Sequence, residues 1–169
     1  MRKALLAIFL LFSFNLYGAG AKIDIPKYDW SWKGFFGTYD RASAQRGLKV
    51  YREVCAGCHS MNYLSYRNLA DLGFSEDHIK AIAAEHLVLD GPNDEGEMFE
   101  RDGIPSDQFV NPYLNENAAR AANNGAYPPD LSLIVKARPK GADYIKALLL
   151  GYVDPPESMK VPKGQHYNK

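Results

Sequence analysis

The chain has few of the residues that cross-link or strongly charge a small protein. Only two of its 169 residues are cysteines, and its 20 basic and 20 acidic side chains balance. Two cysteines cannot build a disulfide framework, and a structural zinc site usually needs four Cys or His ligands. The charge balance provides no basic surface, so we expect no nucleic-acid partner. Beyond the N-terminus there is no long apolar run that would predict a membrane-spanning helix.

The N-terminus predicts a secretory signal. Arg2 and Lys3 precede an apolar run that is short for a spanning helix, and Ala19-Gly20-Ala21 offers a small-residue cleavage site. We therefore predict a signal peptide at residues 1–21 and one mature, exported domain at residues 22–169. Retention of the run as an uncleaved anchor is the alternative.

Helical spacing of apolar residues dominates the mature chain. Ala44, Leu48, Tyr51 and Cys55 recur at intervals of three and four, which is the period of one helix face. No stretch alternates strongly between apolar and polar residues, so we predict a mainly α fold with long irregular loops. The predicted helices span residues 41–55, 61–73, 76–89, 116–124 and 142–152, with Ser75 and Asn115 as N-caps and Gly73 and Gly125 as stops; residues 23–40, 90–115 and 126–141 are expected to be irregular or extended.

The most distinctive stretch is Cys55-Ala56-Gly57-Cys58-His59. A zinc site would lack its second ligand pair, a thiol redox pair would lack its βαβ setting, and a disulfide would close too short a loop to stabilise much. Covalent haem attachment requires this order, because two thiols one helical turn apart reach the two vinyl groups of a porphyrin and the next residue faces the iron. We therefore predict one haem c, with Cys55 and Cys58 as thioether sites and His59 as the proximal iron ligand.

Four segments around this motif resemble signature segments of the cytochrome c1 family, the haem subunits of ubiquinol:cytochrome c reductase. They read "YDRASAQRGLKVYREVCAGCHSMNYLSYRNL", "DGPNDEGEMFERDG", "RAANNGAYPPDLSLIVKARPKGADYI" and "GYVDPP", and "AANNGAYPPDLS" is the most specific part. The resemblance runs from about Trp30 to Asn168. It implies a class I c-type cytochrome-like domain that carries one electron from a Rieske iron–sulfur protein to a soluble cytochrome c. It also implies assembly with cytochrome b at the periplasmic face of the bacterial inner membrane.

The resemblance adds five haem-contacting residues to the attachment motif. It implies that Asn123, Pro128 and Pro129 lie against the haem, and that Arg138 and Tyr144 lie near its propionates. Each role is chemically reasonable, since a guanidinium pairs with a carboxylate, a phenol donates to one, and prolines form rigid apolar walls. From the residues alone, a surface Arg138, a core Tyr144 and a simple Pro-Pro turn remain alternatives.

The sequence departs from the family pattern at its end. Cytochromes c1 complete the iron with a Met beyond a segment resembling "GQHYNK" and then cross the membrane once, whereas this sequence stops at Lys169. We therefore expect that the sequence is truncated at its C-terminus and lacks the distal Met and the anchor. As replacements for the distal iron ligand, we expect four residues to be poor: Met61, Met98, Met159 and His86. The alternatives are a free periplasmic c-type cytochrome and a five-coordinate haem protein with peroxidase or gas-sensing activity.

Two further stretches allow alternative interpretations. Residues 90–102 contain six acidic residues against Arg101 alone, so they either steer a basic partner or form a solvated loop. The aromatic arm at residues 23–40 packs either on its own domain or on a neighbouring subunit.

Overall fold

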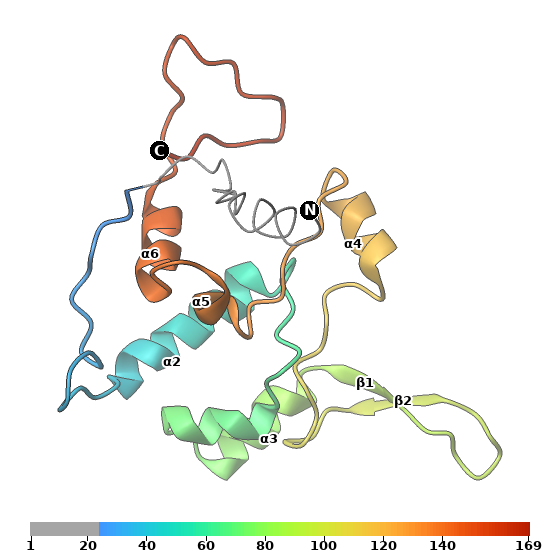
Figure 1. Ribbon diagram of the computed structural model, residues 1–169. Coiled ribbons are helices and arrows are strands. Elements are labelled where there is room, and N and C mark those ends of the chain that lie inside the picture. The colour runs from blue at the N-terminus through green and yellow to red at the C-terminus, as the bar shows by residue number, and fades with distance from the viewer. Residues whose placement is uncertain (1–23) are drawn as a thin grey trace, which may run out of the picture.

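The computed structural model describes residues 24–169, and the predicted signal peptide lies outside them. The regular structure of the described part is mainly helical, as predicted, and includes one short hairpin that was not predicted (Figure 1). The elements are α2 (Arg41–Val50), the π-helical turn η1 (Tyr51–Cys55), the 3₁₀ helix η2 (Tyr66–Leu72), α3 (Glu76–Ala84), β1 (Leu87–Asp90), β2 (Phe99–Asp102), α4 (Glu116–Ala122), α5 (Ile134–Ala137) and α6 (Ala142–Leu150).

The helix ends follow the capping signals in the sequence. The side chains of Ser75 and Asn115 accept hydrogen bonds from the backbone N–H groups of His78 and Ala118, as predicted for the N-caps of α3 and α4. η2 ends at Gly73, whose φ of 88° is the left-handed conformation that glycine adopts without strain. Local signals therefore fix where these helices begin and end.

The helix predicted over residues 76–89 is shorter than expected, and the prediction for its second half is wrong. α3 ends at Ala84, and β1 pairs with β2 as an antiparallel hairpin in which Leu87 lies opposite Asp102. Leu87 and Leu89 are exposed, so Leu87 does not belong to the inner face of α3. The hairpin replaces the helix because Arg101 on β2 forms an ion pair with Asp90 on β1 and closes the two strands.

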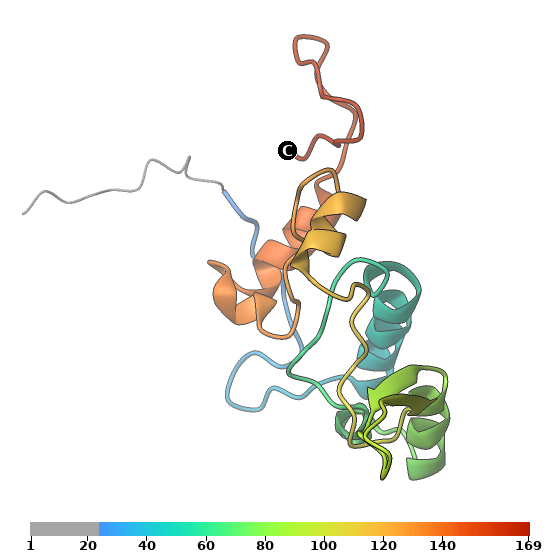
Figure 2. The same ribbon diagram turned by 90° about the vertical axis from the view of Figure 1, so that its right-hand side faces the viewer.

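The core lies between α2 with η1, η2 and α3, at one end of the molecule (Figure 2). Its buried residues are Tyr51, Tyr66, Leu69, Ile79, Ile82, Ala83 and Phe109. Tyr66 stacks on Phe109 with ring centroids 4.7 Å apart, and Tyr51 meets the same ring edge-on. This cluster anchors the C-terminal end of α2, from which the cysteine motif emerges.

The aromatic arm packs on its own domain, along α6. The carboxylate of Asp143, a buried residue, accepts hydrogen bonds from Trp30 Nε1 at 2.6 Å and from the backbone N–H of Tyr28 at 3.3 Å, and Lys33 pairs with it at 3.3 Å. Phe35 and Phe36 at the tip are 95% and 90% exposed, so only part of the arm is covered by the domain. The hydrogen bond from Trp30, together with those from Tyr28 and Lys33, holds the pKa of Asp143 below its usual range.

We expect Asp143→Asn to release the arm, because the amide cannot accept all these bonds and lacks the charge that attracts Lys33. Exchange of the Trp30 indole N–H, followed by NMR, should become faster, whereas Asp29→Asn in the same arm should leave it unchanged. In the wild type the arm should stay attached at pH values above the ordinary Asp pKa of about 3.9 and detach only as the pH falls through the lower pKa of the folded state. Unchanged exchange in Asp143→Asn would show that the aromatic rings alone hold the arm.

Candidate functional site: a cysteine-histidine turn

The cysteine motif forms a tight turn at the end of α2. The wide π-helical turn of η1 closes with a bond from Ala56 N to Tyr51 O at 2.8 Å, and the backbone N–H groups of Cys58 and His59 then donate to Cys55 O at 3.1 and 2.8 Å. Both thiols are free, with Cys55 half-buried and Cys58 exposed. The turn therefore presents two reactive sulfur atoms one helical turn apart, followed at once by an imidazole.

His59 is held in one orientation and one tautomer. Its Nδ1 atom lies 2.8 Å from the carbonyl oxygen of Pro129. A carbonyl only accepts hydrogen bonds, so Nδ1 carries a proton, and in the neutral ring Nε2 is the nitrogen with the lone pair. Nε2 has no hydrogen-bond partner among residues 24–169. This is the state in which a histidine can bind a metal ion, with its other nitrogen fixed by a backbone acceptor.

Tyr51 supports the same turn from below. Its hydroxyl donates to the backbone carbonyl of His59 at 3.1 Å. Burial, and then the negative charge of Asp130, raise the pKa of Tyr51 to about 12. The hydroxyl therefore keeps its proton and remains a donor at any physiological pH.

The Pro129 carbonyl reaches His59 because two distant segments pair. We call residues 60–63 and 129–132 the clasp. Its backbone bond runs from Leu131 N to Ser60 O at 2.9 Å, and Tyr63 N donates to Ser132 Oγ at 3.0 Å. In Figure 1 the segment before α5 passes beside the turn that follows α2.

Asp130 lies at the centre of the clasp. One carboxylate oxygen accepts from Ser60 Oγ and Asn62 N, each at 2.8 Å, and the other accepts from Ser132 N at 2.8 Å. Burial alone would raise the pKa of Asp130, but these hydrogen bonds outweigh it and hold the pKa below its usual range. Asp130 is therefore ionised and fully engaged at neutral pH.

A wall of polar and proline residues stands on the other side of Cys58. Tyr113 Oη lies 3.8 Å from Cys58 Sγ, and Asn123 Nδ2 donates to Tyr113 Oη at 3.1 Å. Cys58, Tyr113 and Pro128 line a cavity of about 100 Å³. The structure thus brings Cys55, Cys58, His59, Asn123, Pro128 and Pro129 into one region.

Arg138 and Tyr144 do not join this group through any contact within the described chain. The guanidinium of Arg138 donates to the carbonyl of Ala137, and Tyr144 lines a separate cavity beneath the aromatic arm with Ile25 and Tyr28. Their approach to haem propionates stays a prediction.

Sequence reasoning missed Tyr113 and Asp130. Tyr113 lies in the irregular "NPYLN" stretch, where nothing in the pattern singles it out. Asp130 directly follows the Pro-Pro pair, but its partners are 68 and 70 residues away, so no local signal reveals its role.

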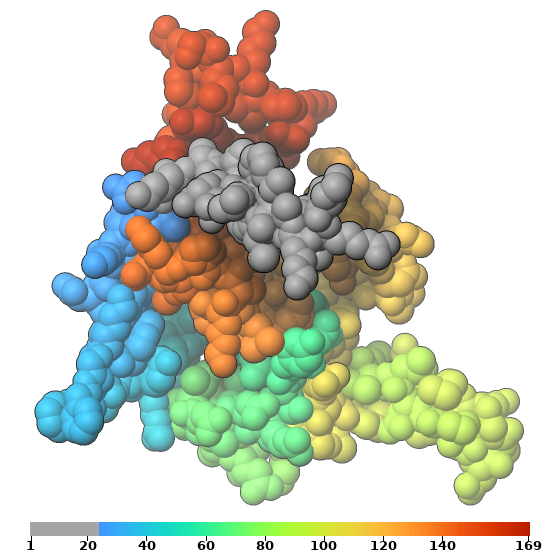
Figure 3. Space-filling view, viewed as in Figure 1, coloured from blue at the N-terminus to red at the C-terminus, as the bar shows by residue number. Residues whose placement is uncertain are grey.

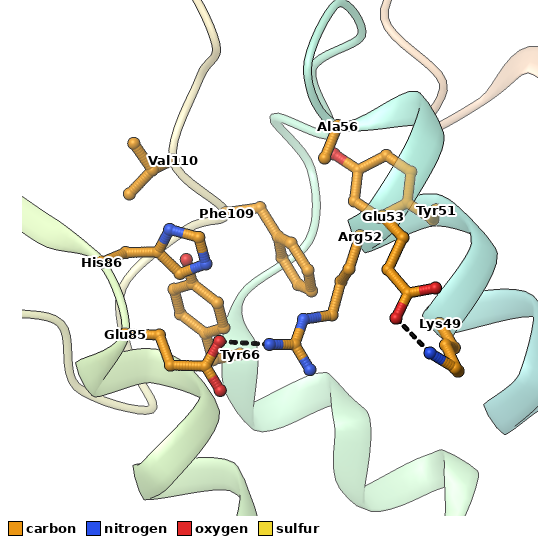
Figure 4. A pocket seen from close by; sticks show the side chains of 10 residues that line it. All are labelled: Lys49, Tyr51, Arg52, Glu53, Ala56, Tyr66, Glu85, His86, Phe109 and Val110. Atoms are coloured by element: carbon orange, nitrogen blue, oxygen red, sulfur yellow. Dashed lines mark hydrogen bonds and ion pairs between the residues drawn. The ribbon is translucent and has the colours of Figure 1, made fainter.

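A second cavity, of about 250 Å³, opens between η1, η2 and the two residues that join α3 to β1, Glu85 and His86 (Figure 4). Arg52 and Glu85 form an ion pair beside it, and the rings of Tyr66, His86 and Phe109 line it. Tyr66 is 1% exposed, and its hydroxyl has no hydrogen-bond partner among the described residues. Burial raises the pKa of Tyr66.

Two free thiols, an imidazole fixed by a backbone acceptor and a proline wall are what a protein needs to hold an iron porphyrin by two thioether bonds and one axial ligand. These features define the class of c-type haem proteins. The chain belongs to the cytochrome c1 family, whose model, described as "Cytochrome C1 family", matches residues 30–169. The predicted family is thereby confirmed, and the predicted haem c is confirmed at the level of the family.

Named relatives agree with this family. The chain is 56% identical over 146 residues to "Cytochrome c1 1, heme protein, mitochondrial" of Arabidopsis thaliana, covering 86% of this chain and 48% of the relative. It is 55% identical over 130 residues to "Cytochrome c1" of Rhodospirillum rubrum, covering 77% and 48%. It is 52% identical over 144 residues to "Cytochrome b-c1 complex catalytic subunit, mitochondrial" of Candida albicans, covering 85% and 50%. The chain therefore spans about half the length of the curated relatives it matches.

None of the helices in residues 24–169 is both long and apolar enough to cross a membrane.

We expect Tyr51→Phe and Tyr66→Phe to have opposite effects on stability. Tyr51→Phe removes a buried hydrogen bond and should lower the free energy of unfolding by about 1 kcal/mol, whereas Tyr66→Phe removes an unpartnered hydroxyl and should leave it unchanged or raise it by about 1 kcal/mol. Denaturant unfolding of the two variants, each losing one oxygen atom, gives the comparison. A loss of stability in Tyr66→Phe would mean that water in the cavity satisfies this hydroxyl.

Proposed function

We propose that this chain is the electron-transfer domain of a quinol:cytochrome c reductase. It would carry one covalent haem c at Cys55 and Cys58, with His59 as the proximal iron ligand. The observation that carries the proposal is the hydrogen bond from His59 Nδ1 to Pro129 O beside two free thiols, because it prepares Nε2 for iron. Family membership and the relatives' names, which include "heme protein" and "Cytochrome b-c1 complex catalytic subunit", support it.

The residues of the turn have separate tasks in this proposal. Cys55 and Cys58 would hold the haem, because each thiol would add its sulfur and its proton across one vinyl double bond, with a carbon–sulfur and a carbon–hydrogen bond formed and no leaving group. Cys58 is the more exposed thiol, and Cys55 is anchored against the core. Pro128 shields the neighbouring space from water as a rigid apolar wall.

A bound haem would supply one iron atom that cycles between the ferrous and ferric states. The protein's own part is to keep His59 still while the charge changes. Its ring cannot rotate without breaking the bond to Pro129, and its backbone carbonyl is tied to Tyr51. A ligand that does not move between oxidation states keeps the structural rearrangement that accompanies electron transfer small.

The proposed setting follows the family resemblance. The domain would be a class I c-type cytochrome domain, exported with residues 1–21 removed, and it would act at the periplasmic face of the inner membrane. It would receive one electron from a Rieske iron–sulfur protein, deliver it to a soluble cytochrome c, and assemble with cytochrome b. The name "Cytochrome b/c1" of a Bradyrhizobium diazoefficiens relative, 47% identical over 166 residues, supports the pairing with cytochrome b.

Removal of the attachment residues should test the haem assignment directly. In a host that attaches haem c, the wild-type chain should keep its haem after denaturation, as seen by mass and by the absorption spectrum with pyridine. Cys55→Ser and Cys58→Ser should each retain a single thioether with a shifted spectrum, and the double variant should lose haem on denaturation. His78→Ala, at an exposed position of α3, is the control substitution and should keep the wild-type haem and spectrum. Wild-type chain without covalent haem would contradict the proposal.

The negative charge of the β1–β2 hairpin supports the proposal that the electron acceptor is a basic protein. It stands out from the body of the protein (Figure 3), and Arg101 is engaged by Asp90 and Asp107. The acidic residues of its tip, Asp94, Glu95 and Glu97, are exposed and form no ion pair within the described chain. A projecting loop with uncompensated negative charge would attract a positively charged cytochrome c and raise its association rate.

Joint replacement of these three residues by Asn, Gln and Gln should slow electron delivery to a basic cytochrome c by about tenfold at low salt. The difference should disappear at high ionic strength, where exposed charges are screened. Stopped-flow kinetics at both salt concentrations makes the comparison, with the high-salt rate as internal control. Equal rates at low salt would leave the hairpin as a solvated loop.

A further inference from the structure

We propose that Asp130 is a positioning residue for the iron ligand. Its carboxylate fixes the clasp so that the Pro129 carbonyl accepts the proton of His59 Nδ1 at the correct distance. This inference rests on the proposed haem function, because it concerns how His59 donates to iron. Asp130 itself forms no hydrogen bond with His59 and acts only through the chain on either side.

Asp130 connects the two segments of the clasp through its own side chain and through its two neighbours in the chain. The residue before it supplies the carbonyl that binds His59, and the residue after it donates its N–H to Ser60 O. Its side chain meanwhile binds Ser60 Oγ and Asn62 N, the residues directly after His59. Two short hydrogen bonds to this one carboxylate, from Ser60 Oγ and Asn62 N, therefore cross-link the two segments next to the 2.8 Å bond, and a third, from Ser132 N, fixes the carboxylate within its own segment.

The chemistry of the carboxylate suits this task better than that of an amide. Hydrogen bonds to an ionised acceptor are shorter and about twice as strong as neutral ones. Asp130 accepts three donors on its two oxygens, whereas an asparagine has only one acceptor oxygen. Asp130→Asn must therefore turn an NH₂ group toward at least one donor, so it loses at least one hydrogen bond, and the remaining bonds of the clasp weaken because their acceptor is no longer charged.

The expected effect on the iron has a definite sign. A hydrogen bond at Nδ1 raises the basicity of a metal-bound histidine, which favours the ferric ion. If the Pro129 carbonyl moves away, His59 becomes a weaker donor and the ferrous ion is favoured. Loss of a nearby negative charge acts in the same direction, so Asp130→Asn should raise the reduction potential.

The experiment uses the haem-bearing full-length chain and two readouts. A redox titration of Asp130→Asn should show the ratio of reduced to oxidised haem increased by up to about tenfold at a fixed potential, which corresponds to about 59 mV for one electron. NMR should show faster exchange of the His59 Nδ1 proton. Asp77→Asn, at an exposed position of α3, removes the same charge without touching the clasp and should change neither readout.

A second variant separates position from charge. Ser60→Ala keeps the Asp130 carboxylate and removes one bond of the clasp, so it should shift both readouts in the same direction but less. A shift in potential for Asp130→Asn alone, with unchanged proton exchange and no effect of Ser60→Ala, would reduce Asp130 to a simple charge and overturn the proposal. Unchanged readouts in Asp130→Asn would also overturn it. A wild-type chain without covalent haem would instead overturn the proposed function itself.

Discussion

The hydrogen bond between His59 Nδ1 and the carbonyl of Pro129 is the contact on which the candidate site depends. It joins residues 70 positions apart and decides which ring nitrogen is free. Without it the imidazole could rotate or take the other tautomer, and the turn of the two cysteines would place no defined ligand. The hydrogen bonds of the clasp hold the Pro129 carbonyl in place. They thereby also fix the path of the chain between α4 and α5.

Two kinds of interaction stabilise different parts of the molecule. On one side, aromatic and aliphatic packing among α2, η2 and α3 buries the rings of Tyr51, Tyr66 and Phe109. On the other side, the segment with Pro128 and Pro129 is held by directed hydrogen bonds and buries little apolar surface. Apolar packing tolerates small shifts, whereas a hydrogen bond weakens quickly with distance and angle. His59, as a ligand that must stay fixed, is therefore held by directed hydrogen bonds.

Features that depend on residues close together in the chain could be predicted from the sequence. Ser75 and Asn115 act as caps because their partners lie three residues away, and the cysteine motif is a turn whose order alone predicts its chemistry. The hairpin was not predictable in this way, because Leu87-Val88-Leu89 is compatible with a helix or a strand until Arg101 is known to lie beside Asp90. Tyr113 and Asp130 were missed for the same reason, since their partners are distant in the chain.

The charge states around His59 are stable over a wide pH range. The lowered pKa of Asp130 means that its contribution to folding is complete above the ordinary Asp pKa of about 3.9 and is lost only as the pH falls through the lower pKa of the folded state. The raised pKa of Tyr51, about 12, means that its contribution is complete below the ordinary Tyr pKa of about 10 and is lost as the pH rises from there through the folded-state pKa of about 12. Between these limits neither group changes charge. Over this range the Tyr51 hydroxyl keeps its hydrogen bond to the His59 carbonyl and the Asp130 carboxylate keeps its hydrogen bonds to Ser60 and Asn62, so the contacts that position His59 are not lost through the titration of either group.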